Sequence, residues 1–142
     1  MVKKEQATQT TGTRKKAVAV ANIRKGKGVI RINSKPLNII EPRYVRMRIR
    51  ESLMIANEIQ KDLVENVDID VRVRGGGVWG QADAVRTAIS NALVDFSKST
   101  ELKEAYLDYD RSMVISDDRR TEPHKPSRSS AGPRRSKQQS KR

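Results

Sequence analysis

The large apolar side chains of this chain are confined to its middle, which limits where a folded core can form. Residues 13–115 hold nearly all of them, whereas residues 1–12 are polar and residues 116–142 contain one alanine and three prolines but no large apolar side chain. A segment must bury apolar surface to offset the entropy lost on ordering it. We therefore expect a flexible N-terminal arm over residues 1–12, a globular core over 13–115 and an extended basic C-terminal tail over 116–142.

The charge of the chain is strongly positive and concentrated in the tail. The formal net charge is +13, from 30 Lys and Arg against 17 Asp and Glu, and residues 119–142 contain nine basic residues and one acidic residue. Such a charge favours a polyanionic partner, either nucleic acid or an anionic membrane surface. No stretch is apolar enough to span a bilayer, the N-terminus lacks the apolar run of a secretory signal, and the tail lacks apolar anchors. The sequence therefore favours nucleic acid.

The residue types used by most metal sites and catalytic sets are nearly missing. The chain has no cysteine and a single histidine, His124, in a segment that looks extended. This excludes a disulfide framework, thiolate metal sites and most histidine-based catalytic sets, and it fits a reducing compartment. Asp117 and Asp118 form a carboxylate pair without metal ligands nearby, which we interpret as local charge balance. We expect no catalytic residue, no metal site and no cofactor.

Three segments of the core have the pattern of β-strands. Residues 16–23 and 29–33 are predicted as strands that the turn 25–28 joins into a hairpin with a basic tip. Residues 68–74 alternate between polar and apolar side chains, which predicts a strand with one buried and one exposed face, with Arg72 and Arg74 on the exposed face.

Three further segments are predicted as helices. The first begins near Pro42, which suits the first position of a helix, and its apolar residues recur at helical spacing as far as Leu63. The second covers residues 81–96, and its many alanines would let it lie close to the sheet. The third is short, and Thr100 can cap it. The side chains that we expect to face inward from the second helix are Val85, Ala88, Ile89, Ala92 and Phe96.

A glycine cluster separates the last predicted strand from the second predicted helix. Its spacing matches a dinucleotide-binding loop, but the preceding strand alternates, and the chain is too short for the second half of such a domain. A P-loop would need Lys and Ser or Thr where Gln81 and Ala82 stand. A tight turn in which only glycine fits is favoured, and a loop whose amides hold an RNA phosphate stays open. We interpret Trp79 as a packing residue, with base stacking as the alternative.

Basic residues of the core are predicted to contact RNA phosphates. On the first helix they recur at i, i+3 and i+7 beside the apolar stripe, and the alternative there is a solvated face with salt bridges to Glu51 or Glu58. The predicted contacts of the core are Arg14, Lys15, Lys16, Lys25, Lys27, Arg43, Arg46, Arg50, Arg72 and Arg74.

Three blocks of the sequence resemble the family of small-subunit ribosomal protein nine, over about residues 12–142. The first block is GTRKKAVA at 12–19, the strongest is GGGVWGQADAVR at 75–86, and the third is DDRRTEPHKP at 117–126, closing in SKR at 140–142. The form EPHKP is similar to the archaeal branch of the family. Asp83 departs from the small residue that many members have, and Gln139 departs from the aromatic residue of many bacterial members.

The resemblance implies an α/β fold with a four-stranded mixed sheet packed with helices, a left-handed βαβ crossover and the extended tail. It implies a non-enzymatic constituent of the small ribosomal subunit in the cytoplasm, which binds small-subunit ribosomal RNA in the subunit head beside neighbouring proteins and takes no small-molecule substrate. The tail tip, Ser140, Lys141 and Arg142, would contact transfer RNA in the peptidyl site. Further residues assigned to ribosomal RNA are Gly75, Gly76, Gly77, Gln81, Arg86, Arg119, Arg120, Lys125, Arg128, Arg134, Arg135 and Lys137.

Two other functions stay open at this point. One is a free nucleic-acid-binding or chaperone-like protein outside the ribosome. The other is a nucleotide-dependent enzyme built on residues 75–80.

Overall fold

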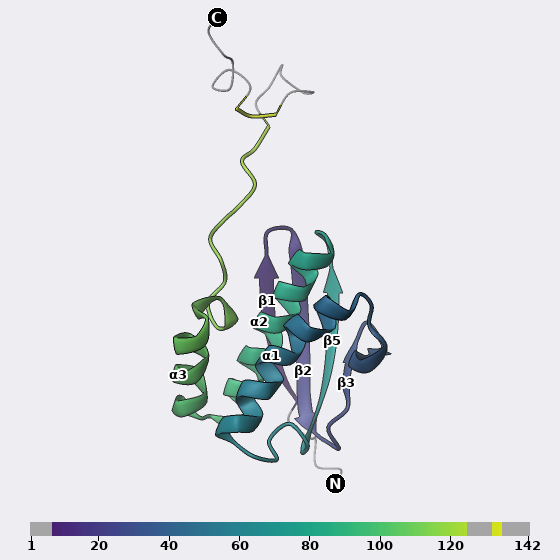
Figure 1. The fold of residues 1–142 in the computed structure, drawn as a ribbon, viewed down its shortest axis with the longest axis vertical. Coiled ribbons are helices and arrows are strands. Elements are labelled where there is room, and N and C mark those ends of the chain that lie inside the picture. The colour runs from purple at the N-terminus through teal and green to yellow at the C-terminus, as the bar shows by residue number, and fades with distance from the viewer. Residues whose placement is uncertain (1–6, 125–131, 135–142) are drawn as a thin grey trace, which may run out of the picture.

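A five-stranded mixed sheet carries helices on one face, as the computed structural model of residues 7–124 and 132–134 shows (Figure 1). The predicted α/β class is confirmed. The strands lie in the order β1-β2-β5-β3-β4 and are β1 Thr8–Arg14, β2 Ala17–Lys25, β3 Ile30–Ile32, β4 Lys35–Pro36 and β5 Val67–Arg74. The helices are α1 Arg43–Ile59, α2 Val78–Ser97 and α3 Thr100–Tyr109, with short 3₁₀ turns η1 Leu37–Ile39 and η2 Arg111–Met113.

The sheet has five strands rather than the four that we expected. The shortest strand, β4, has two residues, Lys35 and Pro36, and pairs only with β3 at the edge of the sheet. Proline has no N–H to donate, so it is tolerated at such an edge.

The first strand, β1, was not predicted. The expectation of a flexible arm over residues 1–12 is wrong for Thr8–Gly12, which belong to β1, and residues 1–6 lie outside the described residues. On the inner face of β1, Thr10 and Gly12 are buried, and the Thr10 hydroxyl donates a hydrogen bond to the Ala88 carbonyl at 2.9 Å. A threonine and a glycine fill this face in place of large apolar side chains, so hydropathy gave no strand signal.

The hairpin predicted from residues 16–23 and 29–33 is wrong, because β5 lies between these two strands. β5 pairs antiparallel with β2 and parallel with β3. The connection from β2 to β3 passes around the start of β5, where the Asp68 carboxylate accepts the backbone N–H groups of Lys27 and Val29 at 2.9 and 3.0 Å. The true hairpin is formed by β1 and β2, with Lys15 and Lys16 as its two-residue turn.

The two parallel strands β3 and β5 are joined through β4, η1 and α1, which makes a βαβ crossover. Its left hand, which the family resemblance implies, stays a prediction.

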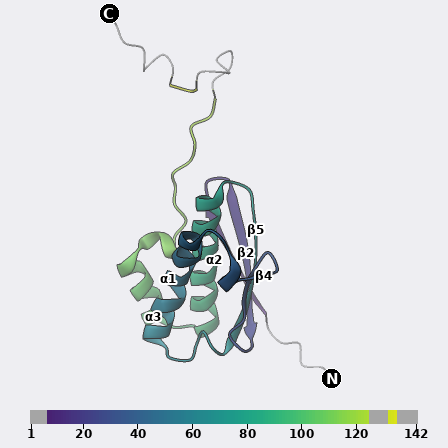
Figure 2. The same cartoon turned by 45° about the vertical axis from the view of Figure 1, so that its right-hand side comes forward.

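Helix α2 lies very close to β1 and β2. Ala84 and Ala88 of α2 are fully buried, as are Ala17, Ala19 and Ala21 on the facing side of β2. At Gly12, an added Cβ would lie 2.2 Å from the Ala84 carbonyl oxygen and 2.5 Å from the Ala88 nitrogen. Small residues on both sides therefore let the helix and strand backbones approach closely, as the alanines of this segment indicated. The views in Figures 1 and 2 show α1 and α2 in one layer over the sheet.

The predicted helices are present, and they differ from prediction at their ends. Helix α1 ends at Ile59 and leaves Leu63 in the following turn. The side chains predicted to face inward from α2 are buried, with Phe96 only partly so. Helix α3 is capped by Ser99 rather than Thr100, because the Ser99 hydroxyl accepts the Leu102 N–H at 3.3 Å.

The close approach at Gly12 gives a stability prediction. Gly12→Ala should lower the free energy of unfolding by about 1–3 kcal/mol, because the new methyl group would overlap backbone atoms of α2. Gly77→Ala serves as the control, since a Cβ there would meet no atom within 4 Å. Urea unfolding followed by circular dichroism measures both, and equal losses in the two variants would contradict the close packing.

Candidate nucleic-acid interface

One end of the sheet gathers several of the residues predicted to bind RNA. Lys15 and Lys16 are exposed in the β1–β2 turn, and the register places Arg74 of β5 opposite Val18 of β2, two residues beyond Lys16. We call the set Lys15, Lys16, Arg72, Arg74 and Gly75–Gly77 the hairpin-end cluster. It lies at the top of the sheet in Figure 1.

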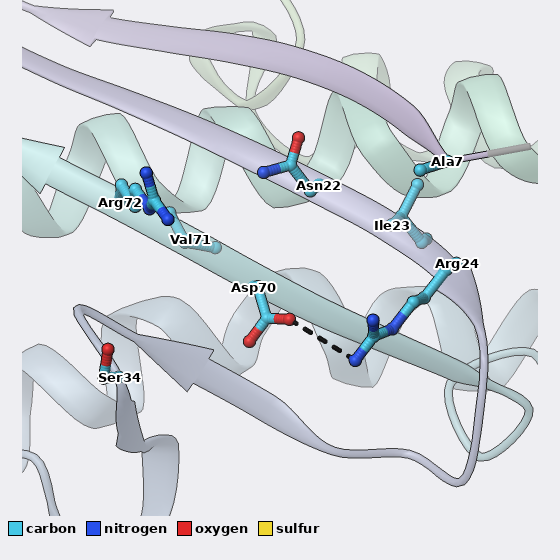
Figure 3. A pocket seen from close by; sticks show the side chains of 8 residues that line it. All are labelled: Ala7, Asn22, Ile23, Arg24, Ser34, Asp70, Val71 and Arg72. Carbon is cyan, nitrogen blue, oxygen red and sulfur yellow. Dashed lines mark ion pairs between the residues drawn. The ribbon is translucent and has the colours of Figure 1, made fainter.

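The open face of the sheet carries both ion-paired and unpaired arginines. Arg24 reaches from β2 towards Asp70 on β5, with 3.8 Å between nitrogen and oxygen (Figure 3). Hydrogen bonds from the backbone N–H groups of the β2–β3 connection lower the pKa of Asp68 in the same half. Arg72 and Arg74 are exposed, and neither forms an ion pair with any residue that the structure describes. Arg72 and Arg74 are therefore available to a ligand at the hairpin end of this face.

The glycine loop is a tight strand-to-helix turn, as predicted. Gly75 and Gly76 have φ of +76° and +66°, which side chains rarely adopt, and a Cβ on Gly75 would lie 2.4 Å from the Lys16 carbonyl oxygen. The Gln81 side-chain amide donates to the Gly75 carbonyl at 3.1 Å and closes the loop. The dinucleotide alternative needs the helix after the loop to lead into a further parallel strand, but α2 is followed by α3 and η2, and no strand follows it in the described residues.

Two of the three arginines predicted on the first helix bind Asn38 of the protein itself. Arg46 donates to the Asn38 carbonyl at 2.6 Å, and Arg50 donates to the Asn38 side-chain oxygen at the same distance. They tie α1 to η1, whereas Arg43 is exposed. The alternative of salt bridges to Glu51 is not realised by these residues, since Glu51 pairs with two other arginines.

Arg86 was predicted to contact ribosomal RNA, and its burial contradicts this. Its side chain is 1% exposed. It donates to Glu51 and to Asp110, each at 2.8 Å, and to the Ser112 hydroxyl at 2.9 Å. The guanidinium therefore joins α1, α2 and η2 inside the protein and has no surface to offer a phosphate.

A second group of charges fixes the point where the tail leaves the core. Arg14 pairs with Asp117, and the Thr13 and Ser116 hydroxyls are 3.3 Å apart. Hydrogen bonds from the side chain and backbone of Arg119, with the Arg119 and Arg14 charges, hold the pKa of Asp117 well below its usual range. We expected Asp117 to serve only as local charge balance. The structure gives it a more specific role, because its ion pair with Arg14 anchors the tail to β1.

Asp83 and Arg48 lie beside the Arg14–Asp117 ion pair, and neither of them was assigned to a site from the sequence. Asp83 binds Arg48 at 3.2 Å and lies 3.8 Å from Arg14. The departure of Asp83 from the family pattern was the one signal that pointed to this pair. Arg14 was predicted to contact RNA, but it is instead engaged by Asp117 and Asp83.

The tail passes the hairpin-end cluster as it leaves the core. The Arg120 guanidinium donates to the Lys15 carbonyl at 3.3 Å, and residues 118–124 are exposed (Figure 1). Arg134 pairs with Glu122 at 2.7 Å.

The remaining residues predicted to bind RNA lie away from the hairpin-end cluster or outside the described part of the chain. Lys25 and Lys27 lie at the opposite end of the sheet, beside the start of β5. The residues outside the described part of the chain are Lys125, Arg128, Arg135, Lys137, Ser140, Lys141 and Arg142.

The described residues contain neither a candidate metal site nor a candidate membrane span. Within 7–124 and 132–134, no group of three or more His, Asp or Glu side chains is arranged to hold a metal ion. No helix of that part is long and apolar enough to cross a membrane.

Comparison with known proteins gives close similarity over nearly the whole chain. The sequence model of a family described as ribosomal protein S9/S16 matches residues 12–142. The small ribosomal subunit protein uS9 of Methanococcus maripaludis strain C7 is 47% identical over 135 residues, which cover 95% of this chain and 98% of the relative. The uS9 protein of Methanococcus vannielii is 47% identical with the same coverage. These relatives agree with the archaeal form of the tail motif.

The network around Arg86 predicts an acid-sensitive stability. Burial opposes the ionisation of Asp110, but hydrogen bonds from the Ser112 side chain and backbone and from Arg86 outweigh it and lower the pKa of Asp110 to about 2. This pKa lies below the ordinary value of 3.8, so the unfolded chain takes up the proton first as the pH falls. Stability from Asp110 is therefore fully present above about pH 4 and lost towards pH 2.

Urea unfolding between pH 7 and pH 2 measures this effect. Asp110→Asn should be less stable than the parent at pH 7, and its stability should fall less steeply below pH 4. Asp108→Asn is the matched control, because Asp108 is an exposed aspartate only two residues earlier, in the last turn of α3. Parallel curves for the parent and Asp110→Asn would contradict the assignment.

Proposed function

The chain belongs to the ribosomal protein S9/S16 family, and from this premise we propose that it binds small-subunit ribosomal RNA through its hairpin-end cluster and its tail. As a member of this family it is a non-enzymatic constituent of the small ribosomal subunit, in the cytoplasm. The rival function of a nucleotide-dependent enzyme is thereby removed. From the family resemblance we further propose that the protein lies in the subunit head, beside other ribosomal proteins.

The observation that carries the proposal is the group of unpaired cations at one end of the sheet. Lys15, Lys16, Arg72 and Arg74 are exposed and form no salt bridge within the described residues. Cations without a partner in the protein are free to neutralise phosphates. An RNA backbone that lies across them releases its condensed counterions, which favours binding. Arginine can donate to two phosphate oxygens, and lysine acts as a mobile point charge.

The tail extends the same basic surface. It leaves the core past Lys15, so the basic residues of 119–142 begin where the hairpin-end cluster ends. We propose that ribosomal RNA surrounds the inner tail, with Arg119, Arg120, Lys125, Arg128, Arg134, Arg135 and Lys137 as its contacts. A segment without large apolar side chains gains order when phosphates neutralise it. Lys25 and Lys27, at the other end of the sheet, would contact a separate RNA segment.

The tip of the tail has a separate role in the proposal. Ser140, Lys141 and Arg142 are the residues that match the family's terminal block, and we propose that they contact transfer RNA in the peptidyl site. The core and inner tail would hold the protein in the subunit, so the two roles can be tested separately.

Removal of the unpaired cations should change the salt dependence of RNA binding. Lys15→Ser with Lys16→Ser should weaken binding of the full chain to a head-domain ribosomal RNA transcript. Each lost phosphate contact should reduce the log-log salt slope by roughly 0.7–0.9. Lys61→Ser with Lys103→Ser removes the same charge from exposed positions outside the predicted contacts and is the control. Filter binding over a range of salt measures the slope, and identical slopes for both pairs would refute the proposed interface.

Substitution of the tail tip should affect transfer RNA and leave assembly intact. Lys141→Ser with Arg142→Ser should keep the protein in small subunits but weaken transfer RNA in the peptidyl site, by on the order of 1 kcal/mol for each mobile charge. Filter binding of transfer RNA to subunits carrying either form measures this. Unchanged affinity at normal occupancy would remove the two residues from the site, and loss of the protein from the subunit would assign the tip to assembly.

Association with the subunit itself has a direct test. The protein in a cell lysate should sediment with the small subunit at both low and high magnesium, when the subunits are apart or joined. Sedimentation outside ribosomal particles at both concentrations would favour the rival of a free nucleic-acid-binding protein.

A further inference from the structure

Two aromatic rings stack on each other at the protein surface, next to the glycine loop. The ring centroids of Tyr44 and Trp79 are 4.5 Å apart and the ring planes differ by 17°. Tyr44 lies in the first turn of α1 and Trp79 in the first turn of α2. Tyr44 is 47% exposed and Trp79 is 55% exposed. Trp79 therefore packs on one neighbour, as we expected of it, but about half of its surface stays in water.

The exposed rings are not isolated in an otherwise polar surface. Val78 precedes Trp79 and is 54% exposed, and Met47 lies one turn after Tyr44 on the same face of α1 and is 55% exposed. An apolar surface of this kind at the start of two helices favours a ligand that covers it. The chemistry of that ligand follows from the charges around the rings.

Basic groups flank the stacked pair on both sides. A Cβ built on Gly80, the residue after Trp79, would lie 3.6 Å from the Arg14 carbonyl oxygen, so the first turn of α2 adjoins the β1–β2 hairpin with its exposed Lys15 and Lys16. On the other side, the exposed Arg43 directly precedes Tyr44.

The carboxylates nearby are mostly neutralised. Asp83, on α2, binds Arg48 and lies close to Arg14, and Glu51, on α1, binds Arg48 and the buried Arg86. Glu41 is the exposed carboxylate just before α1. The surroundings of the rings therefore carry a net positive charge.

We propose that Trp79, supported by Tyr44, is a stacking platform for an unpaired base of RNA. Flat aromatic faces beside cations are how proteins hold single-stranded RNA, because every base has a π face and every nucleotide a phosphate. The stack on Tyr44 fixes the indole ring in advance, so less side-chain freedom is lost when a base binds. This inference rests on the proposed function, since it names the form of RNA that lies beside the hairpin-end cluster.

Charge complementarity favours RNA over a protein partner as the occupant. Basic groups adjoin the rings from the hairpin and from α1, and these would repel the many basic surfaces of an RNA-bound assembly but attract a phosphate chain. A protein that covers the rings is the alternative outcome of the test.

The single tryptophan of the chain makes the platform measurable, because all indole fluorescence comes from Trp79. The full chain is titrated with a 12-nucleotide adenosine RNA and with a fully paired RNA duplex of the same length, each labelled so that anisotropy reports binding. The single strand should quench the emission of Trp79 in step with binding. The duplex should bind by its phosphates with little quenching, since its bases are already stacked.

Substitutions separate stacking from charge. Trp79→Leu should weaken binding of the single strand by roughly ten-fold, with the log-log salt slope unchanged because no phosphate contact is lost. Tyr44→Leu should weaken binding to a smaller degree. Tyr109→Leu is the matched control, because Tyr109 is 60% exposed at the far end of α3 and should leave affinity unchanged. Circular dichroism shows that each variant is folded.

The outcomes distinguish this inference from the proposed function. The platform alone would be overturned if the parent chain binds RNA but both RNAs quench Trp79 equally. The same holds if the affinity of Trp79→Leu for the single strand is within two-fold of the parent's. Failure of the parent chain to bind any RNA, the head-domain transcript included, would overturn the proposed function. In assembled subunits, a photoreactive phenylalanine analogue at position 79 should crosslink to RNA, and crosslinks to protein alone would overturn the platform.

Discussion

The close packing of α2 on the first two strands is the constraint on which the rest of the structure depends. Gly12 lets the backbone of β1 come within reach of Ala84 and Ala88, and the alanines of β2 continue the contact. The first turn of this helix lies beside the hairpin turn, where a Cβ on Gly80 would be 3.6 Å from the Arg14 carbonyl oxygen. The glycines before α2 are required by the same geometry, because Gly75 turns the chain against the Lys16 carbonyl with a positive φ. Packing of small residues thereby decides where the basic turn, the glycine loop and the aromatic pair meet.

Arginines in this protein have two different roles, and burial separates them. Arg86 lies inside the protein and binds Glu51 and Asp110, and removal of one partner from such a buried pair leaves an uncompensated charge. Arg14 and Arg48 bind Asp83 at the surface beside it. Glu51, Asp83 and Asp110, which lie on and beside the helices, are therefore bound by these arginines. The cations of the hairpin-end cluster pair with none of these carboxylates. The charges that hold the fold and the charges that can meet a phosphate are therefore different residues.

The elements that could be predicted were those with a strong local signal. The alternation of β5 and the helical spacing of α2 gave both elements to within three residues at either end, because both patterns are regular and glycines separate the end of β5 from the start of α2. β1 was missed because its inner face holds Thr10 and Gly12. The predicted hairpin of β2 and β3 was wrong because strand pairing depends on contacts between distant segments. β5 lies between these two strands, although they are neighbours in the sequence. Trp79 was assigned to packing, since exposure cannot be seen in a sequence.

By itself the sequence determined where the large apolar side chains of the core lie, the basic composition of the tail, the position of the glycine turn and the family, because these depend on composition and on short blocks of residues. Only the tertiary structure decided which cations remain free. Arg86 meets a carboxylate 35 residues away, and Arg14 meets Asp117 from the other end of the core, whereas Arg72 and Arg74 face outward from a strand without partners in the described part of the chain. A residue's own type gives its charge, but its availability to RNA depends on what the fold places beside it.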